Sequence, residues 1–139
     1  NMIKHHPFIG VGVNTFCRNY TLYKVNQVEG NTADRSYYAH NNFLQMAGEI
    51  GLIGLGIFFW LLFALFRKWY IIYKSLPAGG FLRICSLGLI SGIIAFLING
   101  LTESGLYYSK VATIFWLIVS ILLALFKISM QDISKEQAI

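Results

Sequence analysis

The sequence predicts an all-α integral membrane protein with about three transmembrane helices, preceded by part of a large polar loop that carries short helices. Composition is the first observation: of 139 residues, 56% are hydrophobic, 16% are aromatic and only 12% are charged. A soluble domain carries roughly 25% charged residues, and a mean hydropathy of +0.59 is typical of a membrane protein. The second observation is order along the chain, in which a mixed, polar segment at 1–46 precedes three long apolar runs.

The three apolar runs are long enough to cross a bilayer. Ile50–Phe66 holds 17 residues without a charge, 82–101 is nearly as apolar, and Val111–Phe126 is again uncharged. About 20 residues at ~1.5 Å each span the ~30 Å hydrocarbon core, so we expect transmembrane helices over about 47–66, 82–101 and 109–126. Buried helices of a soluble bundle are the alternative, but such helices would show a polar face, which these runs lack.

The basic residues predict the orientation of these helices. The segment 67–83, which joins the first two runs, carries four basic residues and no acid, which is the pattern of a cytoplasmic loop: Arg67, Lys68, Lys74 and Arg83. We therefore expect a cytoplasmic loop at 67–81, a cytoplasmic tail at 127–139 and an outer segment at 1–46. The net charge of +5 is then mostly an orientation signal, and we expect no nucleic-acid partner because its main support is lost.

Small residues recur in the apolar runs and predict helix contacts. Gly48, Gly51 and Gly54 lie three residues apart, and Gly88 and Gly92 form a GxxxG pattern. Glycine lets helix backbones approach closely in lipid. We expect these helices to pack on one another or on helices outside this chain.

The junction between the polar segment and the first run holds the residues best suited to chemistry. Helical propensity is unbroken from about Asn42, and Asn41 or Asn42 is a natural N-cap. His40 would then lie beside a helix N-terminus at the outer headgroup level, where backbone N–H groups favour anions such as phosphate. A histidine there can act as a general base, and Arg35 and Arg18 could hold phosphate oxygens. The alternative is that His40 only caps or packs at the interface.

Other reactive residue types give weaker indications. Glu49 and Glu103 lie at the outer ends of the first two runs, and each is either a functional group or a solvated interface residue. His5 and His6 are adjacent and point in different directions, so they predict no metal site, and no carboxylate or cysteine spacing adds one. No phosphate-binding glycine loop occurs. We expect neither a metal nor another cofactor.

Two motifs, in order along the chain, resemble the O-antigen ligase and O-antigen polymerase superfamily. The first, HPFIGVGVNTF, covers His6–Phe16 and matches the pattern HPxxGvGxxxF of a large periplasmic loop. The second, HNNFLQMAGEIGLIG, covers His40–Gly54 and matches the pattern HNxxLxxxxExGxxG, which leads into a membrane helix. The polar spacer and the following spans also fit the C-terminal end of that family, so the resemblance covers essentially the whole chain.

The resemblance implies a polytopic glycosyltransferase of the bacterial inner membrane whose active loop faces the periplasm. Such enzymes take a glycan from undecaprenyl pyrophosphate and transfer it to lipid A-core, to another lipid-linked glycan or to a protein hydroxyl. No cofactor is needed, because the pyrophosphate already activates the donor. The catalytic histidine of the family maps onto His40, and the substrate-binding candidates are Arg35, Arg18, Asn41 and Glu49.

The expected partners follow from this resemblance: membrane lipid, the glycan donor, the lipid A-core or glycan acceptor, and N-terminal helices of the same protein. The family's loop arginine usually lies upstream of the first motif, where this chain has none, so we expect a C-terminal fragment that is inactive alone. The rival hypothesis is a non-catalytic membrane subunit or a transporter fragment. Transporters place ionisable groups near the bilayer midplane, whereas the polar groups here gather outside the apolar runs.

Overall fold

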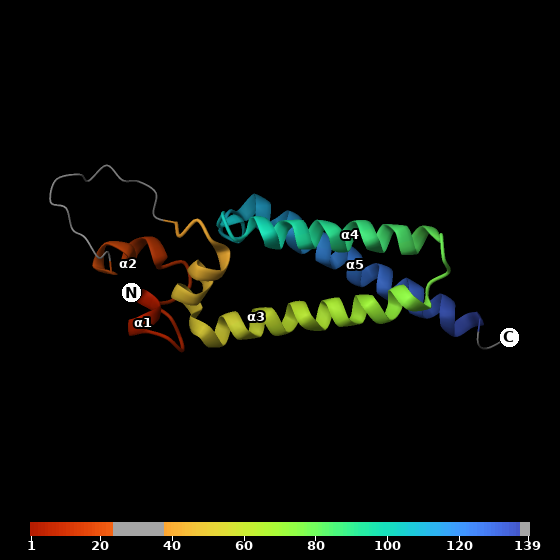
Figure 1. Ribbon diagram of the computed structural model, residues 1–139, viewed down its shortest axis with the longest axis horizontal. Helices are drawn as coiled ribbons and strands as arrows, with labels where there is room; N and C mark the ends of the chain where they lie inside the picture. The colour runs from red at the N-terminus through yellow and green to blue at the C-terminus, as the bar shows by residue number, and fades with distance from the viewer. Residues whose placement is uncertain (24–37, 137–139) are drawn as a thin grey trace. The chain divides into compact units, whose positions relative to one another are not determined.

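The computed structural model describes residues 1–23 and 38–136, and all regular secondary structure in these residues is helical (Figure 1). The elements are α1 (Met2–His5), α2 (Phe16–Tyr23), α3 (Asn42–Ser75), α4 (Phe81–Asn99), the short 3-10 helix η1 (Gly105–Tyr107) and α5 (Ser109–Glu136). The predicted all-α class is therefore confirmed. The chain divides into two compact units, one of Asn1–Trp60 with Gly100–Gly105 and one of Leu61–Asn99 with Leu106–Ile139.

Within the described residues, three helices are long and apolar enough to cross a membrane: α3, α4 and α5. At most 28% of the most apolar stretch of each helix is buried inside the chain. Large apolar side chains such as Trp60, Phe63 and Trp116 are therefore exposed. A soluble protein rarely leaves so much apolar surface in water, so these faces meet lipid or further helices. The chain is a membrane protein, and the side on which each end lies remains a prediction.

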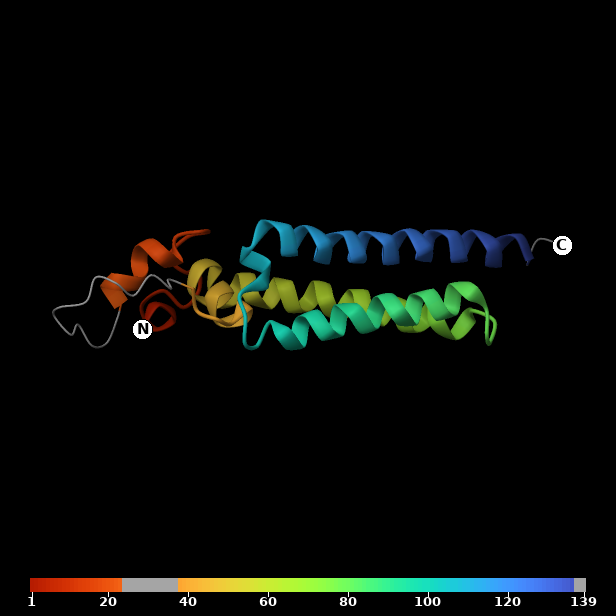
Figure 2. The same cartoon turned by 90° about the horizontal axis from the view of Figure 1, so that it is seen from above.

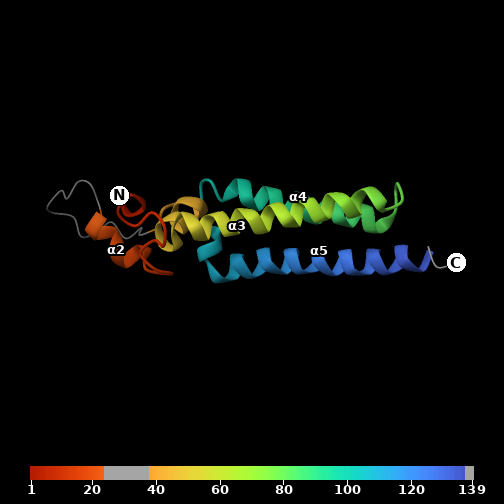
Figure 3. The same cartoon turned by 90° about the horizontal axis from the view of Figure 1, so that it is seen from below.

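In the second unit, α4 and α5 pack along each other (Figure 2; Figure 3). Phe96 of α4 and Phe115 of α5 lie with ring centroids 4.7 Å apart. Ile93 and Leu122 are fully buried in the same unit. Gly88 and Gly92 do not make this contact, because a Cβ added at either would meet nothing within 4 Å. Their predicted contact with helices outside this chain stays a prediction.

The end of α3 lies later than the apolar run alone suggests. The segment 67–81, predicted as a loop, is helical through Ser75 because its basic and aromatic residues tolerate a helix. Pro77 follows and cannot continue the helix, and Gly79, at φ 78°, turns the chain toward α4. The cytoplasmic location of this segment is not tested by its helical structure.

The predicted continuity of the first long helix is wrong at one residue. Gly51 has φ 71° and ψ −177°, a non-helical conformation in the middle of α3. A residue other than glycine is strained at such a positive φ. Propensity along the chain could not show this break, because its cause is a distant segment of the first unit.

Candidate functional site

The N-terminus of α3 begins where the sequence predicts, and Asn41 is its cap. The Asn41 Oδ1 atom accepts hydrogen bonds from the backbone N–H groups of Phe43 (3.0 Å) and Leu44 (2.9 Å). The side-chain amide of Asn41 also donates to the Leu101 carbonyl at 2.8 Å. Asn41 therefore joins the start of α3 to segment 100–105, which follows α4 in sequence and belongs to the same unit.

The capping leaves no N–H group for phosphate at this helix end. The first four backbone N–H groups of α3 all have protein acceptors: Asn42 donates to Gly100, Phe43 and Leu44 to the Asn41 side chain, and Gln45 to the Asn41 carbonyl. These are the groups that a helix N-terminus would offer to an anion. The prediction of an anion site at this N-terminus is therefore wrong.

His40 directly precedes the cap and faces an acid from a distant part of the sequence. Its Nδ1 atom lies 3.7 Å from Glu103 Oε2, and the two side chains are 55% and 53% exposed. The His40 backbone is in the left-handed region, at φ 47°. The structure thus joins two residues that the sequence offers separately, and it presents the pair to solvent rather than burying it.

Two buried polar side chains hold the backbone on either side of His40. The Ala39 N–H donates to Gln45 Oε1 at 3.4 Å, and the Asn41 N–H donates to Ser104 Oγ at 3.2 Å. Gln45 and Ser104 are each only 1% exposed. Supports of this kind restrict the position of a reactive side chain before substrate arrives.

Glu49 is placed quite differently from Glu103. It is 2% exposed, and its two carboxylate oxygens accept hydrogen bonds from the backbone N–H groups of Asn14 (2.7 Å) and Phe16 (3.1 Å). Phe16 is the first residue of α2, so the carboxylate serves as the N-terminal cap of that helix from a distant position. The hypothesis of a solvated interface residue is wrong for Glu49. Its proposed contact with substrate has no support in this geometry.

The loop that carries the first motif forms backbone hydrogen bonds with α3 where the helix is interrupted at Gly51. In a continuous helix, the N–H groups of Leu52 and Ile53 would donate to the carbonyls of Gly48 and Glu49. Here those N–H groups donate instead to loop carbonyls, Leu52 to Pro7 at 2.8 Å and Ile53 to Phe8 at 3.4 Å. The two helix carbonyls accept from the same loop, Gly48 from Val11 and Glu49 from Gly12, each at 2.9 Å. The loop therefore replaces both hydrogen bonds lost at Gly51.

Two glycines permit this insertion. A Cβ added at Gly51 would overlap the Phe8 carbonyl, and a Cβ added at Gly10 would overlap the Glu49 carbonyl. Both glycines also have positive φ, 71° and 72°. The glycine spacing in α3 predicts a close backbone contact correctly, but at Gly51 the partner is a loop and not another helix.

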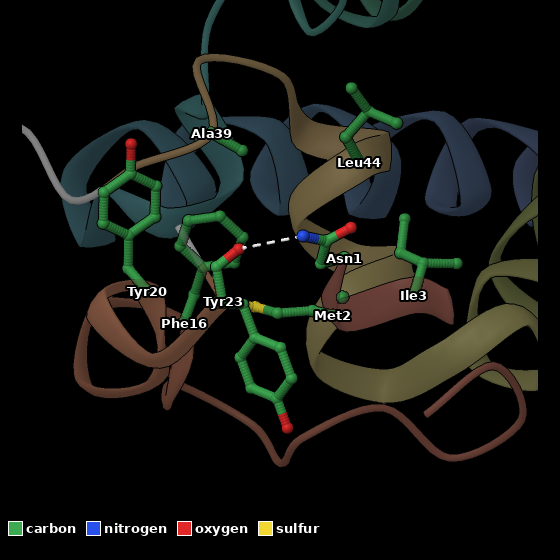
Figure 4. Close-up of a pocket in the computed structure, with 9 residues that line it drawn as sticks. Asn1, Met2, Ile3, Phe16, Tyr20, Tyr23, Ala39 and Leu44 are labelled. Carbon is green, nitrogen blue, oxygen red and sulfur yellow. Dashed lines mark hydrogen bonds between the residues drawn. The ribbon is translucent and has the colours of Figure 1, made fainter. Parts of the chain in front are cut away.

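A pocket of about 240 Å³ lies in the first unit, and its lining includes Ala39, the residue before His40 (Figure 4). Its lining is aromatic and aliphatic with no charged side chain: Asn1, Met2, Ile3, Phe16, Tyr20, Tyr23, Ala39, Leu44 and Gly48. The side-chain amide of Asn1 donates to the Tyr23 carbonyl across it at 3.4 Å. Such a lining suits an apolar or ring-shaped group and holds no cationic side chain for a pyrophosphate.

The other candidates from the sequence are two arginines and the N-terminal histidines. Arg18 is exposed on α2, whereas Arg35 lies outside the described residues. His6 Nε2 lies 3.0 Å from the Tyr23 hydroxyl, and no group of His, Cys or carboxylate residues in 1–23 and 38–136 could hold a metal ion.

We predict that Glu49→Ala destabilises the first unit by about 3 kcal/mol. Removing the carboxylate leaves the part-buried N–H groups of Asn14 and Phe16 without their charged acceptor, and each such loss costs about 1–3 kcal/mol. Glu49→Gln keeps one acceptor oxygen, so its loss should be smaller. The measurement is thermal unfolding in detergent, followed by protease cleavage within 12–23. Glu103→Ala is the control, and a Glu49→Ala variant that melts at the same temperature as this control contradicts the assignment.

Comparison with known families reaches the same segment of the chain. Residues 1–59 match the model of the O-antigen ligase family, which confirms the resemblance carried by the two motifs. The matched residues include His40, Asn41 and Glu49, together with the loop inserted at Gly51. Neither the curated proteins nor the solved structures contain a match to the chain.

Proposed function

From the match of residues 1–59 to the O-antigen ligase family, we propose that this chain is part of a membrane glycosyltransferase of bacterial surface polysaccharide synthesis. It moves a glycan from undecaprenyl pyrophosphate to an acceptor, either lipid A-core or a growing glycan. The observation that carries the proposal is the exposed His40–Glu103 pair. His40 lies at the capped start of α3, inside the matched segment. Glu103 lies in segment 100–105, which is hydrogen-bonded to Asn41.

The proposed reaction is a single displacement at the anomeric carbon of the donor. The acceptor oxygen attacks this carbon, and its proton passes to the His40 imidazole as the general base. The bond between the anomeric carbon and the pyrophosphate oxygen breaks, and undecaprenyl pyrophosphate leaves with the electron pair. The configuration at the anomeric carbon is inverted. Glu103, 3.7 Å from the ring, stabilises the imidazolium that forms.

Arginine side chains are proposed to hold the pyrophosphate, because the α3 N-terminus has no N–H group to give. Arg18 is exposed on α2 and forms no ion pair among the described residues, and Arg35 is the second candidate from the sequence. A guanidinium binds phosphate oxygens in a bidentate manner. Asn41 supports the site by capping α3 rather than by touching substrate.

The donor lipid places this reaction at the outer leaflet of the inner membrane. The site precedes the apolar stretch of α3, and the basic segment 67–83 follows it. A periplasmic site therefore puts 67–83 on the cytoplasmic side, which is the orientation that its basic residues predict. The pyrophosphate would then lie at headgroup level while its isoprenoid chain remains in the bilayer.

The test is deletion of the complete gene, followed by analysis of surface glycan on gels and of lipid-linked glycan by mass spectrometry. Loss of a ligase leaves unmodified lipid A-core and accumulated long lipid-linked glycan, whereas loss of a polymerase leaves single repeats. Either pattern, restored by the gene, supports the proposal. An unchanged glycan profile combined with a lost substrate or proton flux would make the protein a transporter and overturn it.

We predict that Glu103→Gln lowers glycan transfer by about fivefold or less. Both partners of the pair are about half exposed, and exposed ion pairs contribute only about 0.2–1 kcal/mol. The measurement is the initial rate of transfer in membranes, with Lys110→Gln, at the start of α5, as a charge-changing control. A loss as large as that of the His40 variant would show that Glu103 itself handles the proton.

A further inference from the structure

A second pocket lies in the other unit, where α3 and α5 present basic and apolar side chains together. It measures about 580 Å³ and is lined by Lys68, Leu123, Phe126, Lys127, Met130 and Gln131. The lining holds two ammonium groups and no carboxylate. In the described part of the chain, neither lysine forms an ion pair with an acid.

Both lysines lie at the same level relative to the apolar sequence. Lys68 follows the uncharged run Ile50–Phe66 by two residues, and Lys127 follows Val111–Phe126 directly. The edge of such a run marks the edge of the hydrocarbon core, and lipid phosphates lie just beyond it. Lysine side chains extend toward that level from the ends of spanning helices. The two ammonium groups are therefore placed where phosphate groups lie.

The apolar part of the lining has the character of an acyl-chain contact. Leu123 is 44% and Met130 is 56% exposed, whereas Phe126, also in the lining, is buried at 1%. The pocket thus joins a positive end to an apolar surface. An amphiphile with an anionic headgroup matches both parts at once.

Two other basic side chains of the same unit, Arg83 and Lys74, are held by the protein itself. Arg83 donates to the Leu76 carbonyl at 3.2 Å and lies over the Tyr73 ring at 4.3 Å. Lys74 lies over the Tyr70 ring at 4.6 Å. These contacts distinguish Arg83 and Lys74 from Lys68 and Lys127, which face the pocket.

We propose that this pocket binds one anionic phospholipid, with its phosphate between Lys68 and Lys127 and an acyl chain along Leu123 and Met130. Basic pockets between membrane helices are known to hold anionic headgroups. The two ammonium groups favour a lipid with an anionic headgroup. Their position at the ends of the apolar runs favours a membrane lipid over a soluble anion. The site is separate from the His40 site and does not depend on the proposed glycan transfer.

The experiment is native mass spectrometry of the complete gene product, released from nanodiscs of phosphatidylglycerol or of phosphatidylcholine. We expect one retained phosphatidylglycerol, and a loss of about 30-fold in its affinity in K68Q/K127Q, because each basic group near an anionic surface contributes about 1 kcal/mol. K74Q/K110Q removes the same charge elsewhere and should retain the lipid. K68R/K127R keeps the charge and should also retain it.

Four outcomes would overturn the proposal, provided that circular dichroism shows equal helix content in the variants. They are equal retention in K68Q/K127Q, an equal loss in the control pair, equal retention of phosphatidylcholine, and displacement of the lipid by millimolar inorganic phosphate alone. Amine cross-linking tests whether a protein segment, and not a lipid, occupies the pocket. If Lys68 or Lys127 cross-links to a second copy or to another helix and no lipid is retained, the pocket is a protein interface.

Discussion

Replacing His40 with Ala is expected to lower glycan transfer by about 100-fold or more while the protein is expressed and inserted normally. A positioned general base contributes about 10²–10⁴-fold to a rate, and the imidazole is the group placed to take the acceptor proton. Its side chain is about half exposed, so its removal creates no cavity in a packed core. The effect should therefore appear in transfer and not in stability.

The measurement is complementation of a deletion strain with the complete gene, read as the amount of glycan joined to its acceptor. His5→Ala is the matched control, because His5 is an exposed histidine of the same unit whose ring contacts Tyr23. Normal transfer by the His40 variant, at equal protein level, would remove His40 from the mechanism and leave it a structural role at the start of α3.

Replacing Gly51 with Ala is expected to release the inserted loop and to abolish activity through loss of structure. The added methyl group would overlap the Phe8 carbonyl, and the backbone at φ 71° and ψ −177° is strained for any other residue. Strain of this kind costs about 1–3 kcal/mol, and the overlap adds to it. If α3 instead closes into a regular helix, the loop loses its hydrogen bonds to Gly48, Glu49, Leu52 and Ile53.

Protease protection of residues 1–23 measures this effect directly. Gly56→Ala is the control in the same helix, because a Cβ at Gly56 meets nothing within 4 Å, and it should leave protection unchanged. Equal protection in the two variants would show that the loop stays in place without the glycine. Loss of protection in Gly51→Ala but not in Gly56→Ala would show that Gly51, in the second motif, is needed to hold the loop of the first motif in place.

The fold was predictable where local sequence decides it. Uncharged runs of sufficient length predict the spanning helices, and a residue with a short polar side chain at the right place predicts the Asn41 cap. The break at Gly51 was not predictable in this way, because helix propensity considers only neighbours in sequence. The break depends on a loop that begins 44 residues earlier, at Pro7, and donates and accepts backbone hydrogen bonds in place of the helix.

The candidate site shows the same division. His40 and Glu103 both stand out in the sequence as ionisable groups at membrane boundaries, but only the fold brings them to 3.7 Å. Glu49 looks equivalent to Glu103 in sequence, yet it is buried as the cap of α2. The helix N-terminus that suggests an anion site is already satisfied by Asn41 and Gly100. Arg35 lies outside the described residues, so its role stays a prediction.

Transfer from a defined donor is the direct test of His40 as the general base of glycan transfer. The complete gene product is purified, reconstituted with a synthetic undecaprenyl-pyrophosphate-linked glycan and an acceptor, and compared with its His40→Ala variant. We expect one undecaprenyl pyrophosphate released for each glycan joined, inverted anomeric configuration in the product and about 100-fold slower release by the variant. Release that proceeds equally in both proteins, or a product with retained configuration, would contradict it.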